Sequence, residues 1–133
     1  MSSAVLLDTD VASALFKGKQ LPILTRIAGL EPVLSFATLA ELKKWAVVRS
    51  WAPKNRGVLD TWLAQFAVIH SSDAMADTWA ELAADGHLRG RHRPQNDTWI
   101  AAVALVYQIP LATLNFKDFE DLETHHGLRL IRP

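Results

Sequence analysis

The sequence predicts a three-layer α/β/α protein with a mostly parallel central sheet. Short apolar runs of the kind seen in strands buried on both faces alternate along the chain with longer segments whose apolar residues recur every three or four positions, as in helices. This alternation places helices on both faces of a parallel sheet. The length suits one core, so we expect a single domain over residues 1–133.

The first half of the chain alternates strand and helix. The apolar run Ala4–Leu7 is followed by Asp8, Thr9 and Asp10, and either Thr9 or Asp10 is expected to cap the next helix. The elements predicted in this half are a strand over 4–7, helices over 11–17 and 21–28, a strand over 32–36 and a helix beginning at Thr38.

The second half continues the same alternation. A polar break at 52–57 precedes it, and the segment 85–95, with two glycines, a proline and three arginines, predicts the clearest loop. The predicted elements are helices over 58–66, 74–84 and 97–107, and strands over 67–69, 111–114 and 128–131.

The composition excludes several classes of function. The chain has no cysteine, which excludes a disulfide framework, a thiol nucleophile and a cysteine-ligated metal. Fourteen basic residues balance fourteen acidic ones, so no overall charge attracts nucleic acid or membrane. No apolar stretch approaches the ~20 residues of a membrane span and no basic leader opens the chain. We therefore expect a cytoplasmic protein without a membrane partner.

Acidic and amide side chains recur near the ends of the predicted strands. Asp8 follows the first strand, and Glu41 lies in the first turn of the helix after the second. Asn115 closes the strand 111–114, and Asp97 opens the helix before it. Because ligands bind beyond the carboxyl ends of parallel strands, we expect these four side chains to gather at one edge of the sheet.

Each of these residues also has a purely structural explanation. Asp8 suits a turn or a helix cap, and Glu41 has the spacing of a capping box with Thr38. Asp97 suits an N-cap, and Asn115 suits a strand terminus. Their joint placement favours function, because two carboxylates ~4 Å apart repel by about 4 kcal/mol at an effective dielectric of 20 unless a cation neutralises them. Mg²⁺ and Mn²⁺ prefer such oxygen ligands, and the chemistry that fits is metal-assisted phosphodiester hydrolysis.

Four segments, in order along nearly the whole chain, carry these acids within distinctive local patterns. They are Leu6–Val11, Thr38–Leu42, Asn96–Ala102 and Thr113–Phe119. Together they resemble the motifs of the PIN-domain ribonucleases, and within that family the toxins of VapBC-type toxin-antitoxin modules. The resemblance implies the PIN-like fold, an Mg²⁺- or Mn²⁺-dependent endoribonuclease activity, and inhibition by a cognate antitoxin protein.

The resemblance also assigns roles to individual residues. It makes Asp8 and Asp97 the principal metal ligands, with Glu41 as a third acid, bound directly or through water, and as a candidate base for the attacking water. The fourth catalytic position is Asn115, a neutral residue where the family often has Asp. Two further acids, Asp10 and Asp118, are candidate supporting groups around the metal.

Basic residues near these acids are candidates for contacting RNA phosphates. They are Arg89, Arg91 and Arg93 in the predicted loop, and Lys43 and Lys44 after Glu41. The alternative is that the loop is a solvated connection whose charges only aid solubility. The family resemblance, together with large apolar residues between Leu42 and Trp51, also predicts a homodimer.

Two other functions remain open from the sequence. Asp8-Thr9-Asp10 after a buried strand is similar to the nucleophile motif of haloacid-dehalogenase-like phosphatases, in which Asp8 would form a covalent aspartyl-phosphate. Alternatively, the neutral Asn115 is consistent with a catalytically inactive PIN-like domain that binds RNA or protein.

Overall fold

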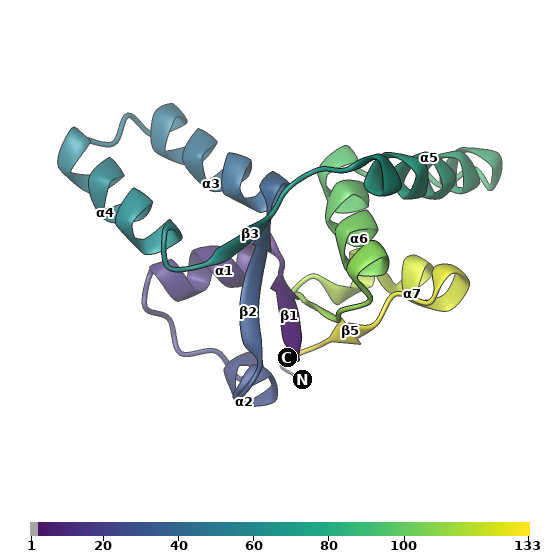
Figure 1. Cartoon of the computed structure of the whole chain (residues 1–133), viewed down its shortest axis with the longest axis horizontal. Helices are drawn as coiled ribbons and strands as arrows, with labels where there is room; N and C mark the ends of the chain where they lie inside the picture. The colour runs from purple at the N-terminus through teal and green to yellow at the C-terminus, as the bar shows by residue number, and fades with distance from the viewer. Residues whose placement is uncertain (1–2) are drawn as a thin grey trace.

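The structure is a computed structural model that describes residues 3–133. Its centre is a five-stranded sheet in the order β3-β2-β1-β4-β5 (Figure 1). Every neighbouring pair of strands is parallel, which confirms the predicted sheet. The strands are β1 (Ala4–Leu7), β2 (Glu31–Ser35), β3 (Ala67–Ile69), β4 (Leu111–Ala112) and β5 (Leu130–Ile131).

Helices cover both faces of the sheet, as predicted for three layers. They are α1 (Thr9–Phe16), α2 (Ile23–Ile27), α3 (Phe36–Val48), α4 (Pro53–Leu63), α5 (Asp73–Leu88), α6 (Gln95–Tyr107) and α7 (Glu120–His126), with a short 3-10 helix η1 (Phe116–Asp118) before α7. Figure 1 shows α3 and α4 projecting together on one side of the molecule and α5 projecting on the other.

Two apolar cores lie against the two faces of the sheet. Alternate residues of β1 supply them: Leu6 enters one core, whereas Val5 and Leu7 enter the other. The first core joins the sheet to α5, α6 and α7, and its largest fully buried side chain is Phe119. The second joins the sheet to α1, α2, α3 and α4, with Leu59 and Leu63 of α4 buried in it. The two cores explain why consecutive residues of β1 are apolar, since each face of the strand is buried.

The strand register brings three loops together at one edge of the sheet. Strand β1 lies between β2 and β4, with Leu6 opposite Val33 and Leu7 opposite Ala112. The backbone N–H of Asp8 continues this ladder by donating to the carbonyl of Ala112 at 2.9 Å. The residues that follow β1, β2 and β4 are therefore neighbours, although they come from distant parts of the sequence.

Several predicted boundaries are wrong, each for a local reason. The polar break at 52–57 is mostly helix, because α4 begins at Pro53, a residue favoured in the first helical turn. Helix α5 continues through Gly86 to Leu88, so the predicted loop at 85–95 is limited to the residues between α5 and α6. Strand β4 is only two residues long, so Asn115 does not close it directly.

The predicted helix caps also need correction. The N-cap of α1 is Asp8, whose side chain accepts from the N–H of Thr9, so neither Thr9 nor Asp10 has that role. Ser35 caps α3, which places Thr38 inside the helix and rules out the capping box with Glu41. Pro94 is the N-cap position of α6, so Asp97 is not a cap. Over residues 3–133, no helix is long and apolar enough to cross a membrane.

Candidate active site

The predicted site acids lie at the carboxyl edge of the sheet, and we call this group the acid edge. Each stands in the loop or first helical turns beyond a strand, or at the start of α6, which approaches from the other side. Their charges act on one another, which places them in one electrostatic neighbourhood. The acid edge consists of Asp8, Asp10, Glu41, Asp97 and Asp118.

Asp8 is the most enclosed of these acids, with 6% of its surface exposed. Both carboxylate oxygens accept a hydrogen bond: Oδ1 from the N–H of Thr9 at 2.8 Å, and Oδ2 from the hydroxyl of Thr113 at 2.7 Å. Burial, followed by the charge of Asp10, raises the pKa of Asp8 to about 7, and the two hydrogen bonds only partly oppose this shift. The fold therefore holds a carboxylate where its charge is unfavourable.

Asp10 ties the start of α1 to the loop after β4. Its Oδ1 accepts from the N–H of Val11 at 2.7 Å, and its Oδ2 accepts from the N–H of Leu114 at 3.2 Å. Burial raises the pKa of Asp10 despite these hydrogen bonds. Asp10 thus positions the segment that carries Asn115.

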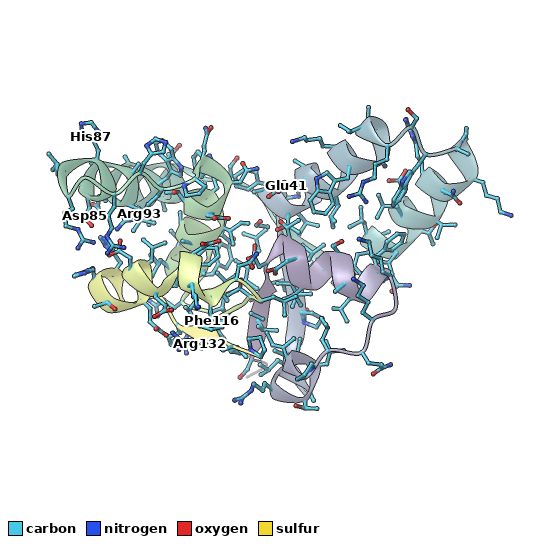
Figure 2. All side chains as sticks on the ribbon, turned by 180° about the vertical axis from the view of Figure 1, so that it is seen from behind. Glu41, Asp85, His87, Arg93, Phe116 and Arg132 are labelled. Atoms are coloured by element: carbon cyan, nitrogen blue, oxygen red, sulfur yellow. The ribbon has the colours of Figure 1, made fainter. Side chains whose placement is uncertain are left out.

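A chain of hydroxyl groups orients Glu41. The hydroxyl of Thr9 donates to Glu41 Oε1 at 3.2 Å. Because that donation uses the only proton of the Thr9 hydroxyl, Thr38 must donate in the 3.0 Å contact between the two threonine oxygens. Thr9 and Thr38 belong to α1 and α3, so these bonds hold the two helices in register beside the acid edge. Figure 2 shows Glu41 where the start of α3 approaches α6.

Asp97 stands half-buried in the first turn of α6. Burial, followed by the charges of Asp118, Glu41 and Asp10, raises its pKa to about 6. These three groups come from η1, α3 and α1, so the shift reports convergence of four separate segments. The helix N-terminus, which favours negative charge, does not overcome the burial and the repulsion.

Asn115 is exposed beside this group. Its backbone N–H donates to the hydroxyl of Thr113 at 3.1 Å, the same hydroxyl that donates to Asp8. Its side-chain amide makes no hydrogen bond to the described residues and is free to meet a ligand. The amide adds no charge, so it does not increase the repulsion.

The acid edge contains oxygen donors of the type that hard divalent cations prefer. None of its five acids forms a salt bridge within residues 3–133, so no basic side chain neutralises them. In the part of the chain that the structure describes, no three acidic or histidine side chains converge closely enough to hold an ion as they stand. The chemistry of the donors fits Mg²⁺ or Mn²⁺, and ligation requires their side chains to draw together.

The predicted RNA-contacting residues occupy different environments. Arg89 and Arg93 form ion pairs with Asp85 and Asp121, and the Arg93 side chain is only 9% exposed. Arg91 is 66% exposed, and its one ion pair within residues 3–133 is a 4.0 Å contact to Asp121. Lys43 and Lys44 are exposed on α3. Of the three arginines, only Arg91 has a largely free guanidinium group.

Three threonines of the site were not predicted from the sequence: Thr9, Thr38 and Thr113. All three are buried and all three form hydrogen bonds that reach an acid of the edge directly or through another hydroxyl. Threonine is common at helix N-caps, so the sequence favoured a capping role for Thr9 and Thr38 over a role in the site. A signal was nevertheless present, because each lies within one of the four segments that contain the site acids.

Comparison with known proteins gives an independent view of the chain. The model of the PIN domain family matches residues 5–124. The protein Ribonuclease VapC1 of Haemophilus influenzae strain R2866 is 29% identical over 119 residues, which is 86% of this chain and 89% of that protein. The region that the family model matches contains the whole acid edge.

Solved structures resemble the fold over nearly its full length. The structure of VapBC-1 from nontypeable Haemophilus influenzae has a TM-score of 0.81 and 27% identity, covering 96% of both chains. VapBC-5 from Mycobacterium tuberculosis gives a TM-score of 0.73 and 26% identity, covering 98% of this chain and 99% of that one. The DNA-bound VapBC2 of Rickettsia felis, with a TM-score of 0.82 and 23% identity over 98% of each chain, supports the fold alone.

Proposed function

Because the chain belongs to the PIN domain family, we propose that it is an endoribonuclease toxin of a type II toxin-antitoxin system that hydrolyses RNA phosphodiester bonds. The observation that carries this proposal is the acid edge, where the charge of Asp97 acts on Asp8, that of Glu41 acts on Asp97, and none of the three forms an ion pair within residues 3–133. Similarity to Ribonuclease VapC1 over most of both chains supports the same activity. The cytoplasm, which contains RNA, is the proposed location.

The proposed cofactor is Mg²⁺ or Mn²⁺. Asp8 and Asp97 would hold the ion, with Glu41 as the third acid, bound directly or through water. When bound, the ion supplies positive charge for the phosphate oxygens and lowers the pKa of a water molecule. The all-oxygen donor set and the unneutralised charge of the acid edge support this assignment.

The chain's own residues divide the remaining tasks. The Thr9 hydroxyl donates to one oxygen of Glu41, which leaves the other oxygen to accept a proton from the attacking water. Thr113 and the N–H of Thr9 fix the orientation of the Asp8 carboxylate. The exposed amide of Asn115 can donate to a phosphate oxygen, where a fourth carboxylate would repel it.

The two alternative functions gain no support. A phosphatase of the haloacid-dehalogenase type needs Asp8 as a nucleophile, and the buried, hydrogen-bonded setting of Asp8 does not favour that role over metal ligation. The family match over 5–124 favours the nuclease. For the inactive domain, Asn115 is the only supporting feature, and the cleavage experiment below decides it.

The proposed partners are a cognate antitoxin and a second copy of the chain. The similar structures named above are VapBC complexes, and an antitoxin arginine placed among the unpaired acids would take the position of the cation. For the homodimer, Val47 and Val48 at the end of α3 are 61% and 69% exposed. Trp51 stacks on Phe16 within one subunit, so Val48→Glu is the suitable variant. Light scattering at micromolar concentration should give twice the chain mass for the wild type and the chain mass for Val48→Glu.

RNA cleavage by the purified chain tests the proposal. With Mg²⁺ or Mn²⁺, the wild type should cut RNA internally, and a chelator should stop the reaction. Asp8→Asn and Asp97→Asn should each lower the rate by more than about 100-fold while keeping a native circular dichroism spectrum. Asp60→Asn, on the exposed surface of α4, is the matched control and should cleave normally. Wild-type rates in both site variants would reject the assignment, and no cleavage by the wild type would favour the inactive domain.

A further inference from the structure

The short segment between α5 and α6 is folded back against α5 in a fixed conformation. The N–H of Arg91 donates to the carbonyl of Gly86 at 2.7 Å. A Cβ atom at Gly86 would lie 2.7 Å from the carbonyl oxygen of Arg91, so a larger residue there would push the segment away. Glycine inside α5 costs helix stability, and this close approach explains its presence.

Arg93 anchors the same segment from its other end. Its guanidinium group donates to the carbonyl of Leu82 and pairs with Asp121 and, at 3.3 Å, with Asp85. Figure 2 shows Asp85 and Arg93 together on the side of α5 that faces α7, whereas His87 points away from α7. Arg93 is thus committed to holding the segment and has no free charge for a ligand.

Two surface hollows meet at this segment. The first, which we call the Trp79 hollow, has a volume of about 450 Å³, within the ~300–1,000 Å³ typical of ligand sites. The second, the Lys117 hollow, has a volume of about 440 Å³. They adjoin because they share Arg91, His92 and Arg93 as lining residues. The Trp79 hollow also contains Ala83, His87, Gln95 and Thr98, and the Lys117 hollow also contains Pro94, Asp118 and Asp121.

The two hollows form a continuous trough that reaches the acid edge. Asp118 lines the Lys117 hollow, and its charge is the largest of those that raise the pKa of Asp97. Gln95 and Thr98 of the Trp79 hollow project from other faces of α6 than Asp97, because successive helical residues are about 100° apart around the axis. A ligand that spans the trough would therefore reach the acid edge through the Lys117 hollow.

The side chains of the trough have the character of a site for single-stranded nucleic acid. Arg91 and Lys117 are exposed cations, and no acidic residue lines the Trp79 hollow among those that the structure describes. Trp79 is held in place by stacking on Trp99, with ring centres 5.2 Å apart and ring planes 23° apart. An aromatic ring beside imidazole and amide groups suits an unpaired base, and flanking cations suit its phosphates.

We propose that this trough binds single-stranded RNA beside the scissile phosphate, with Arg91 and Lys117 contacting phosphates and the Trp79 hollow accepting one unpaired base. The inference rests on the proposed ribonuclease function and specifies the surface along which its RNA substrate would lie. It also separates the loop arginines by role: Arg91 contacts the ligand, whereas Arg89 and Arg93 are positioning residues.

Binding of a fluorescently labelled single-stranded oligoribonucleotide tests the trough without using cleavage. The measurement is made in chelator with the Asp97→Asn protein as background. Arg91→Gln and Lys117→Gln should each weaken binding roughly three- to tenfold at low salt. Each should also reduce the slope of log affinity against log salt by about 0.7, the loss of one phosphate contact on a single strand. Lys19→Gln, beyond the far end of α1, is the charge-matched control and should change neither quantity.

A second variant tests the base-binding part. Ala83→Phe fills the Trp79 hollow and should weaken binding of the normal oligonucleotide, while an oligonucleotide with abasic positions should bind the variant and its parent equally. Unchanged affinity and salt slope in both Arg91→Gln and Lys117→Gln would overturn the proposal, as would equal or tighter binding of duplex RNA. If the wild type cleaves RNA but these variants bind normally, only the trough is wrong. If the wild type fails to cleave RNA with either metal, the proposed function itself is wrong.

Discussion

Two groups of acids in this protein have pKa values that are shifted in opposite directions. At the acid edge, burial and neighbouring negative charge raise the pKa of Asp8 to about 7 and that of Asp97 to about 6. Between α5 and α7, hydrogen bonds from His126 and Arg93 lower the pKa of Asp85 to about 2, and Arg93 lowers that of Asp121. We call this second group, with Arg89 and Arg93, the ion-pair cluster.

The ion-pair cluster uses charge to stabilise the fold, whereas the acid edge keeps its charge for a ligand. The ion-pair cluster is satisfied within the chain, because each carboxylate faces an arginine. Among the described residues, the acid edge has no such partner and relies on threonine hydroxyls and backbone N–H groups. Only the second arrangement leaves negative charge available to a cation from outside.

The largest expected difference between the two groups lies in how each makes the free energy of unfolding depend on pH. Asp8 and Asp97 hold protons in the folded chain at pH values where unfolded carboxyl groups, with a pKa near 3.9, have lost them. The stability from these protonated forms is fully present below about pH 4 and is lost as the pH rises through 6 and 7. In chelator, urea unfolding should therefore show a lower free energy of unfolding at pH 8 than at pH 5, by at most about 3 kcal/mol from Asp8.

The control for this effect is the Asp8→Asn protein, which should lose much less stability over the same interval. The contribution of the ion-pair cluster to stability should change with pH in the opposite direction. Because the pKa values of Asp85 and Asp121 are lowered, their contribution is present above about pH 4 and is lost as the pH falls toward 2. An identical decline from pH 5 to 8 in the wild type and in Asp8→Asn would contradict the account of the acid edge.

A smaller effect is expected from the ion-pair cluster. Arg93→Gln leaves the Leu82 carbonyl and the Asp121 carboxylate without their main partner. We expect the free energy of unfolding at pH 7 to fall by about 2 kcal/mol, because unpaired polar groups with little access to water are costly. In chelator, Asp97→Asn should instead raise the free energy of unfolding, since it removes a charge that its neighbours repel.

Thermal or urea unfolding of the two variants measures this contrast. Asp60→Asn provides the baseline for removing one exposed charge. If Arg93→Gln is as stable as the wild type, or if Asp97→Asn loses as much stability as Arg93→Gln, the division into structural and functional acids is wrong.

The sequence was sufficient for the part of the molecule where local pattern and burial agree. Strands such as β1 are apolar throughout because both of their faces are covered, and the acids that follow them need no other information to be placed at the sheet edge. The parallel sheet and the convergence of Asp8 and Glu41 were predicted on this basis. Asp97 follows no strand, and its predicted place at the same edge depended on α6 returning to it. The metal, the antitoxin and the homodimer remain predictions.

The sequence was insufficient where the partner of a residue lies far along the chain. Thr9 contacts Thr38 across 29 positions, and Arg93 pairs with Asp121 across 28, so neither contact has a local signal. Helix α7 was missed because five of its seven residues are charged or histidine and only Leu122 is buried. Without α7 there was no Asp121 to engage the arginines, which therefore resembled free RNA contacts.

Carboxyl-carbon NMR titration of the metal-free chain, repeated with Mg²⁺, tests whether the acid edge is an unpaired, cation-binding site. We expect that Asp8 titrates near pH 7 and Asp97 near pH 6 without metal, and that Mg²⁺ lowers both pKa values. Asp121, already paired with arginine, should titrate below its ordinary value in both conditions. Ordinary pKa values for Asp8 and Asp97 that Mg²⁺ leaves unchanged would contradict the claim that the acid edge is an unpaired, cation-binding site.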